Sequence, residues 1–337
     1  MSVAADKQHE DIASFEGVQA RRGPWADAWR RLLRNKAAVL GGTFIILLIL
    51  SAIFVDNWII AKPLGKEVKP LLAPYHFAQV NFKMRDKPPL TPGYLLGTDY
   101  LGRDVLSRTL YGTRVSLAVA FVAALVSLVV GITYGLISGY ASSRIDNLMM
   151  RFVDFLYGFP VLIFIILMQV YFKAVSRRGG SGLASVFVSI DKALGGMFFI
   201  FIALGLLNWI GMARIARGQT LAQKEKEFVE AARAVGAGHV RIIFRHILPN
   251  ILGPCIVAET LAIPGYIFTE AFLSFIGLGV NPPTPSWGLM ISETYQALRT
   301  SWWQSMVPGA ALTLTTLAFN FLGDGLRDAL DPRLRGT

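Results

Sequence analysis

Six runs of apolar residues constrain this chain more than any other feature of its sequence. They lie at about residues 37–55, 115–137, 152–172, 194–213, 251–277 and 306–322. A helix needs about 20 apolar residues to cross the roughly 30 Å hydrocarbon core of a bilayer, and each run is close to that length. The alternating ten-residue segments of a transmembrane β-barrel are not visible in the sequence. It therefore predicts an all-α polytopic membrane protein with six transmembrane helices.

The basic residues lie beside these runs and not within them. The net charge is +11, which in a water-soluble protein would suggest nucleic acid as a partner. Basic residues beside membrane spans are better explained by topology and by anionic lipid, so we expect membrane lipid and no nucleic acid. Six spans place both termini on one side, and the density of Lys and Arg favours the cytoplasm for both. The polar, acidic start is unlike a cleavable signal peptide.

The segments outside the spans divide the chain further. Residues 1–23 lack periodicity and are predicted to be a disordered cytoplasmic tail. Residues 24–36 predict a basic amphipathic helix in the inner membrane interface, the alternative being a solvated basic tail. The apolar side of that helix is expected to carry Trp25, Trp29, Leu32 and Leu33. Residues 37–335 would form the transmembrane domain, with an extracytoplasmic loop at 56–112 and a cytoplasmic loop at 214–250.

Smaller signals predict local structure within the spans and loops. Glycines recur every fourth residue at Gly131, Gly135 and Gly139, and such a ridge lets helices pack closely in lipid, either within the chain or against a partner. Pro160 predicts a kink or break in the third span. Residues 173–192 read as a Gly/Ser-rich loop. Before the second span, Thr98 or Asp99 is the expected helix cap.

A polar, basic island at residues 228–250 interrupts the apolar pattern. Two helical patterns lie in it, each with apolar residues at i, i+3, i+4 and i+7. Gly236 stands where a glycine would end the first helix, and Pro249 would end the second. The members of the two stripes are Phe228, Ala231, Ala232 and Val235, then Val240, Ile243, Phe244 and Ile247. The island predicts two short helices joined by a tight turn, and a hairpin packed only on its own protein is an open alternative.

The wording of this island resembles that of a known family. Glu230-Ala231-Ala232, then Gly236, then Leu248-Pro249 is similar to the EAA loop of binding-protein-dependent ABC importer permeases. The general pattern has an isoleucine where His246 stands, and the local wording is similar to the dipeptide and oligopeptide branch. The stretches 96–108, 271–279 and 323–332 also resemble that branch, the first through its GTD-x-x-GRD-V signature.

The resemblance implies a type I ABC importer permease fold and a C-type subunit of a peptide importer in the bacterial inner membrane. It implies four kinds of partner: a second homologous permease, two ABC ATPase subunits, an extracytoplasmic peptide-binding protein and lipid. The sequence has no G-x-x-x-x-G-K-[ST] phosphate loop, so we expect no cofactor on this chain and ATP with Mg on the partner ATPases. The residues implied to dock an ATPase are Glu230, Ala231, Ala232, Gly236, Ala237, Leu248 and Pro249.

Polar side chains at membrane depth are functional candidates because burying them in lipid is unfavourable. Glu259 and Glu270 are eleven residues apart, which returns them to nearly one face of a helix about 16 Å further along. Both are candidates for a polar substrate path, although Glu270 could instead lie at the outer interface or pair with a partner chain. Asn208 and Asn320 are weaker candidates, with packing hydrogen bonds as the alternative.

The remaining polar residues suggest structure more than chemistry. Asp154 lies one turn from Arg151 and is expected to pair with it. Four scattered histidines and a single cysteine, Cys255, give no metal-ligand spacing. No catalytic constellation is visible, so we expect a translocation subunit and not an enzyme.

Three other functions remain open. The same machinery could import nickel, glutathione or a peptide-like antibiotic. An ion-gradient-driven secondary transporter should show inverted repeats and broken helices at the midplane, and no convincing repeat is visible. A membrane scaffold without transport is the third alternative, and it leaves the EAA-like wording unexplained.

Overall fold

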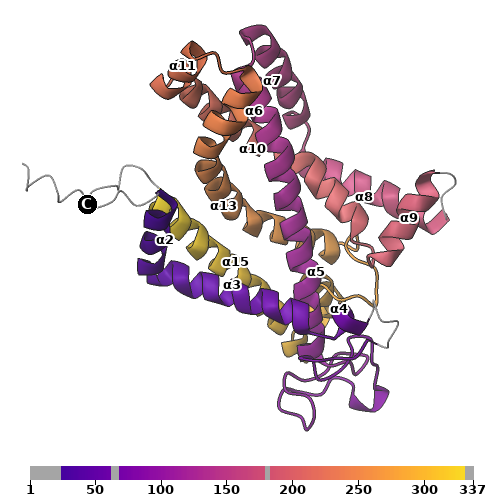
Figure 1. Ribbon diagram of the computed structural model, residues 1–337. Helices are drawn as coiled ribbons and strands as arrows, with labels where there is room; N and C mark the ends of the chain where they lie inside the picture. The colour runs from indigo at the N-terminus through magenta and orange to yellow at the C-terminus, as the bar shows by residue number, and fades with distance from the viewer. Residues whose placement is uncertain (1–23, 62–67, 179–182, 331–337) are drawn as a thin grey trace, which may run out of the picture.

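The structure is a computed structural model that describes residues 24–61, 68–178 and 183–330, and within these ranges it contains helices and loops but no β-strand (Figure 1). The elements are α2 (Pro24–Arg34), α3 (Lys36–Phe54), α4 (Trp58–Ala61), η1 (Phe82–Met84), α5 (Val105–Val126), η2 (Ser127–Gly131), α6 (Ile132–Tyr140), α7 (Ser143–Tyr157), α8 (Val161–Arg178), α9 (Leu183–Ala193), α10 (Phe198–Lys224), α11 (Glu227–Ala234), α12 (His239–Arg241), η3 (Ile242–Ile247), α13 (Leu248–Phe275), α14 (Trp287–Thr294), η4 (Tyr295–Ala297) and α15 (Trp303–Leu330).

Five helical stretches are long and apolar enough to cross a membrane. They are Lys36–Phe54, Val105–Tyr140, Phe198–Lys224, His239–Phe275 and Trp303–Leu330. The pair α7 and α8 passes the same test together but is bent by 73° at its break, and counted as one span it makes the sixth. Pro160 stands in that break, as expected of a residue that cannot donate a backbone hydrogen bond. The all-α fold with six predicted spans is therefore confirmed, with a broken third span.

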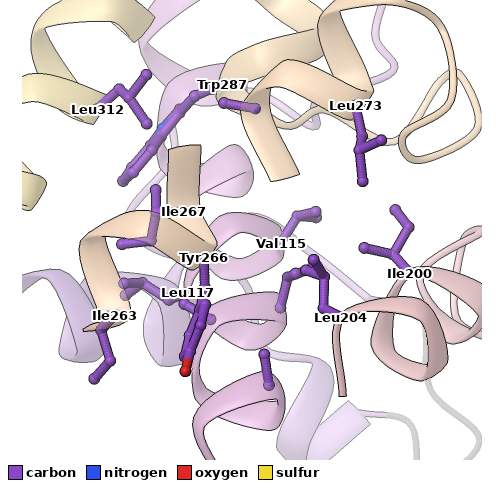
Figure 2. Packing of buried hydrophobic residues seen from close by; sticks show 14 of the residues in the cluster. Val115, Leu117, Ile200, Leu204, Ile263, Tyr266, Ile267, Leu273, Trp287 and Leu312 are labelled. Atoms are coloured by element: carbon purple, nitrogen blue, oxygen red, sulfur yellow. The ribbon is translucent and has the colours of Figure 1, made fainter. Parts of the chain in front are cut away.

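The spans pack around a core in the middle of the molecule. Here α13 contacts α5, α10, α14 and α15, while α15 also lies along α3 (Figure 1). Trp287 of the short helix α14 is fully buried, and its indole Nε1 donates to the Thr109 carbonyl oxygen at 3.1 Å. Figure 2 shows the surrounding apolar side chains, which include Val115, Leu117, Ile200, Leu204, Ile263, Tyr266, Ile267, Leu273 and Leu312. The helix α14 is thus a wedge that joins three spans.

The glycine ridge packs against α10 of the same chain. A Cβ atom added to Gly135 would lie 2.5 Å from the Ala213 carbonyl oxygen, and one added to Gly139 would lie 2.9 Å from that of Arg217. Both distances are far inside van der Waals contact, so only glycine permits this approach. The sequence left open whether the ridge packs within the chain or against a partner. In the structure it packs within the chain.

The N-terminal helix is shorter than predicted and its apolar side is divided. It ends at Arg34, because the Asn35 side chain accepts hydrogen bonds from two backbone N–H groups and caps α3. Leu32 is buried against α3 and α15, whereas Trp29 and Leu33 are exposed. The helix therefore packs partly on its own protein, and its place in the membrane interface stays a prediction. The predicted disordered tail at 1–23 lies outside the described residues.

Two predicted loops are partly helical. Residues 173–192 were expected to be a loop, but α8 runs to Arg178 and α9 begins at Leu183. The long loop expected at 56–112 ends where α5 begins at Val105. The cap of α5 is Asp104, which accepts from the Ser107 backbone N–H at 2.8 Å. The prediction of Thr98 or Asp99 was wrong because the Asp99 carboxylate instead closes a turn, accepting from the N–H groups of Leu101 and Arg103.

Candidate functional site

The island between the spans forms a helical hairpin at one end of the molecule (Figure 1). Its first helix, α11, ends at Ala234 and is followed by Val235 as its C-cap. Gly236 comes next with φ +85°, a conformation that glycine adopts without a steric penalty. A turn then leads into α12. We call residues 227–249 the hairpin and this part of the molecule the hairpin end. The opposite end, which carries loop 68–104, is called the loop end.

The second half of the hairpin is not a separate helix. From His239 the chain is helical without a break to Phe275, through the π-helical turn η3 and into α13. The prediction that Pro249 ends a helix was wrong, because Pro249 lies in the first turn of α13, where a missing N–H is tolerated. The hairpin is therefore covalently and structurally continuous with a membrane span.

A single fully buried side chain anchors α11 to the rest of the chain. Val229 packs against Ile242, Ile247 and Ile251, with Ala232 and Ala237 half-buried beside it. The predicted apolar stripe lies largely on the outward side, where Phe228 is 40% exposed and Val235 is 89% exposed. The helix presents that stripe outward because the inward contact is made by Val229, which lies next to the stripe.

The residues predicted to dock an ATPase lie on or beside this outward face. Glu230, Ala231, Gly236 and Pro249 are exposed, and Ala232, Ala237 and Leu248 are half-buried. A Cβ atom at Gly236 would meet nothing within 4 Å. Next to it lies an open hollow of about 850 Å³, whose lining is Gly238, His239, Val240, Arg241, Phe244, Arg245 and Pro249. Val240 and Phe244 are 70% and 60% exposed. An apolar surface with basic margins is thus open to a partner.

Polar contacts fix the position of the hairpin relative to the spans. The Tyr140 hydroxyl and His239 Nδ1 are 2.9 Å apart, which joins the end of α6 to α12. Lys224 Nζ donates to the Gly139 carbonyl oxygen at 2.8 Å, and the Arg233 guanidinium lies 5.8 Å from the Tyr140 ring centre. The hairpin surface is therefore exposed but held in place.

Two ion pairs hold α7 against α10 near the hairpin end. Arg217 donates to both carboxylate oxygens of Asp146 at 2.6 Å. Asp154 accepts from Arg214 at 2.7 Å, so the expected pairing with Arg151 was wrong. The Arg214 guanidinium also stacks 4.3 Å from the Tyr157 ring centre, which brings it to Asp154 from the neighbouring helix. Spacing along one helix could not reveal this partner.

The four residues predicted to line a substrate path have different surroundings. Glu259 and Glu270 are 3% and 0% exposed, and both point into the chain toward α5. Asn208 is half-buried and donates to the Leu204 carbonyl oxygen of its own helix at 2.7 Å. Asn320 is exposed on α15. The path role of each of them stays a prediction.

A buried charge cluster at the loop end was missed in the sequence. The Asp99 carboxylate accepts from Arg103 Nε at 2.6 Å and lies 3.7 Å from Arg108 Nε. The Glu293 carboxylate accepts from both arginines at 2.9 Å. Arg108 is 1% exposed. Two positive and two negative side chains balance, which is how a protein tolerates buried charge. Wording similar to a known signature marked residues 96–108, but no local signal connects Glu293 to them.

Neighbouring polar contacts attach the loop to one further helix, α15. Gln304 Nε2 donates to Asp86 Oδ1 at 2.7 Å and to the Thr98 carbonyl oxygen at 3.1 Å, and Trp303 Nε1 donates to the same oxygen. Burial raises the pKa of the nearby Asp104 carboxyl, against the opposing effect of hydrogen bonds from Ser107. The loop end is thus joined internally to α5, α14 and α15.

Comparison with known families adds an independent finding. Residues 131–336 match the family described as binding-protein-dependent transport system inner membrane component. Residues 23–89 match the family described as the N-terminal TM domain of oligopeptide transport permease C. The two matches together cover the hairpin and residues 68–89 of the loop.

Individual relatives are similar over almost the whole chain. The oligopeptide transport system permease protein OppC of Haemophilus influenzae is 41% identical, over 93% of this chain and 90% of that protein. The dipeptide transport system permease protein DppC of Bacillus subtilis is 40% identical, over 92% and 86%. The glutathione transport system permease protein GsiD of Pectobacterium atrosepticum is 38% identical, over 93% of each.

Proposed function

Because this chain belongs to the family of binding-protein-dependent transport system inner membrane components, we propose that it is a permease subunit of an ATP-driven importer of oligopeptides or dipeptides. The oligopeptide and dipeptide permeases that it matches at 41% and 40% identity support this cargo. The match to the N-terminal domain of oligopeptide transport permease C supports a C-type subunit. Its place is then a bacterial inner membrane.

The observation that carries this function is the outward apolar face of the hairpin. Val235, directly after α11, is 89% exposed beside the open glycine turn at Gly236. An apolar face left bare by its own chain fits a groove on another subunit. We assign the docking of an ABC ATPase to this face. The residues proposed for the contact are Glu230, Ala231, Ala232, Gly236, Ala237, Leu248 and Pro249.

The rest of the assembly follows from this assignment. Two ATPase subunits would hold ATP and Mg, a second homologous permease would complete the pore, and an extracytoplasmic binding protein would deliver the peptide. The hairpin and both termini then lie in the cytoplasm, and loop 68–104 lies outside. Asn320, exposed on α15, is the path candidate that this conformation leaves accessible.

The first test is a pull-down of the chain from native membranes in mild detergent, with co-purifying ATPase activity measured. Wild type should recover ATPase subunits, and Glu230→Lys should lose them because a positive charge replaces a negative one on the docking face. Glu225→Lys is the matched control, since Glu225 is also exposed but lies at the end of α10, outside α11. Failure of the wild-type chain to recover any ATPase would overturn the assignment.

Two further variants test the shape of the docking face. Gly236→Asp and Ala231→Arg should leave membrane insertion intact while uptake and ATPase association fall, because charge or bulk would enter the contact. Normal uptake with unchanged association in both would contradict docking at this face.

Competition of labelled peptide uptake by glutathione or nickel would decide among cargoes. Uptake that persists with an inactive ATPase would indicate an ion-driven transporter.

A further inference from the structure

Two buried carboxylates connect α13 to α5 at matching positions. Ser116 and Ser127 are eleven residues apart on one helical stretch, and Glu259 and Glu270 are eleven residues apart on the other. Ser116 Oγ donates to Glu270 at 3.0 Å, and Ser127 Oγ donates to Glu259 at 2.9 Å. The pairing runs in opposite directions along the two helices, so the equal spacing makes two rungs of one antiparallel ladder. The rungs lie about 16 Å apart along the helix axis.

The second oxygen of each carboxylate is bound within α13 itself. Tyr266 Oη donates to Glu259 at 2.8 Å, and Ser274 Oγ donates to Glu270 at 2.7 Å. Ser116, Ser127 and Ser274 are 0% exposed. Among the ion pairs of the described residues, neither carboxylate has a basic partner. Both groups are therefore occupied by hydroxyl donors of their own chain and do not face an open path.

The rung formed by Ser127 and Glu259 also contacts a third span, α10. Ser127 Oγ lies 3.3 Å from the Asn208 carbonyl oxygen of α10, and Ser127 begins the π-helical turn Ser127–Gly131. A π-helical turn inserts an extra residue and changes which side chains face a neighbour. It therefore lets Ser127 meet α13 while the glycines that follow meet α10.

We propose that Glu259 and Glu270 are positioning residues that fix the register of α13 on α5, so that displacement of the hairpin moves the two helices as one body. The inference rests on the proposed docking role of the hairpin, which is continuous with α13 over 37 residues. Apolar contacts are non-directional and define a helix register less sharply than hydrogen bonds, which in a low-dielectric interior require a fixed geometry. Because the spacing is equal on the two helices, a single register satisfies both rungs. Sliding by one residue would therefore break both rungs at once.

Double-mutant cycles on thermal unfolding of the purified chain test the ladder directly. Glu270→Met and Ser116→Ala should act non-additively, since each removes the same rung, and the same holds for Glu259→Met with Ser127→Ala. The cross pair Glu270→Met with Ser127→Ala is the matched control and should be additive, because its sites are about 16 Å apart. Additive shifts within both rungs would overturn the proposal.

Transport measurements separate positioning from contact with the peptide. In the assembled transporter, Glu259→Met and Glu270→Met should lower the peptide moved per ATP hydrolysed by about 2- to 30-fold, with the half-saturating peptide concentration unchanged. Glu259→Gln and Glu270→Gln should restore the ratio toward wild type, because an amide still bonds to hydroxyl groups. An altered half-saturating concentration at an unchanged ratio would overturn the proposal and favour a substrate path.

The two proposals can fail separately. The unfolding cycles need no ATPase, so loss of the docking assignment in the Glu230→Lys pull-down would leave their outcome intact. Conversely, the unfolding shifts within each rung could be additive in a chain that still recovers its ATPase. That result would disprove the ladder and leave the docking proposal intact.

Discussion

The two ends of this molecule handle their polar and apolar side chains in opposite ways. At the loop end, Asp99, Arg103, Arg108 and Glu293 are drawn inside and satisfy one another. At the hairpin end, the large apolar side chains Val235 and Phe244 are 89% and 60% exposed. A stable chain ordinarily does the reverse with each class of residue. The charged side chains of the loop end are paired within the chain, whereas the hairpin end exposes an apolar surface suited to binding a partner.

This difference assigns separate physical roles to the two ends. Internal charge pairing holds loop 86–104 on α5, α14 and α15, so the loop end should resist deformation. The hairpin depends on Val229 and a few polar contacts, and it should respond to whatever binds it. If this is right, substitutions at the loop end act on stability, and substitutions at the hairpin end act on association.

The largest effect is expected from Arg108→Met at the loop end. The change leaves Glu293 and Asp99 with one arginine in place of two, and breaking a buried charge network costs about 3–5 kcal/mol of unfolding free energy. Thermal unfolding in detergent measures it. Arg144→Met, at an exposed arginine of α7, is the control and should change little. Equal effects of the two variants would break the comparison.

A smaller effect is expected from Gly135→Ala in α6, where the helix packs on α10. The new Cβ would lie 2.5 Å from the Ala213 carbonyl oxygen, a backbone atom that cannot move aside cheaply. Overpacking of this kind destabilises by about 1–3 kcal/mol. Gly218→Ala in α10 meets nothing within 4 Å and should stabilise by up to about 1 kcal/mol through helix propensity. The changes in unfolding free energy should therefore have opposite signs in the two variants. The same unfolding assay tests whether close contact between the spans requires glycine.

A still smaller effect is expected from Asp154→Asn. The pair with Arg214 is exposed on both sides, and exposed ion pairs contribute about 0.2–1 kcal/mol. The loss should shrink as salt rises, because salt screens exposed charges. An effect as large as that of Arg108→Met would show that ion pairs at the hairpin end are no weaker than those at the loop end.

The smallest change in stability is expected from Phe244→Ser at the hairpin end. The side chain is 60% exposed, so the unfolding free energy should stay within about 0.5 kcal/mol of wild type. Recovery of ATPase in the pull-down should nevertheless fall, because an apolar contact is removed from the docking face. Unchanged recovery would place the docking face elsewhere on the hairpin and weaken the contrast between the ends.

What the sequence predicted correctly was carried by patterns of local origin. Apolar run length predicted the spans, Pro160 stands in the break of the third, and Gly236 ends α11. These signals are local because span length, a missing N–H group and a positive φ depend on few residues. Partners across helices were not predicted, as with Arg214 for Asp154 and Glu293 for Arg108. These partners depend on which helices pack together, and the spacing of residues along one helix does not indicate its neighbours.

The inward face of the hairpin shows the same limit. Periodicity at 228, 231, 232 and 235 correctly marks an apolar stripe but does not say which way it faces. That direction depends on a single residue, Val229, and on the helix beneath it. The ladder of Glu259 and Glu270 is intermediate, since their shared face was predicted but their serine partners were not.

The exposed hairpin surface also bears on how many copies of this chain a cell keeps. Under the proposed docking, a subunit made without its ATPase would display Val235, Val240 and Phe244 to the cytoplasm. Exposed apolar side chains are a feature by which quality-control proteases and chaperones identify unassembled proteins. Covering that surface would therefore protect the subunit from turnover. The same few side chains that are proposed to receive the ATPase would then also match the abundance of the permease to the supply of its partner.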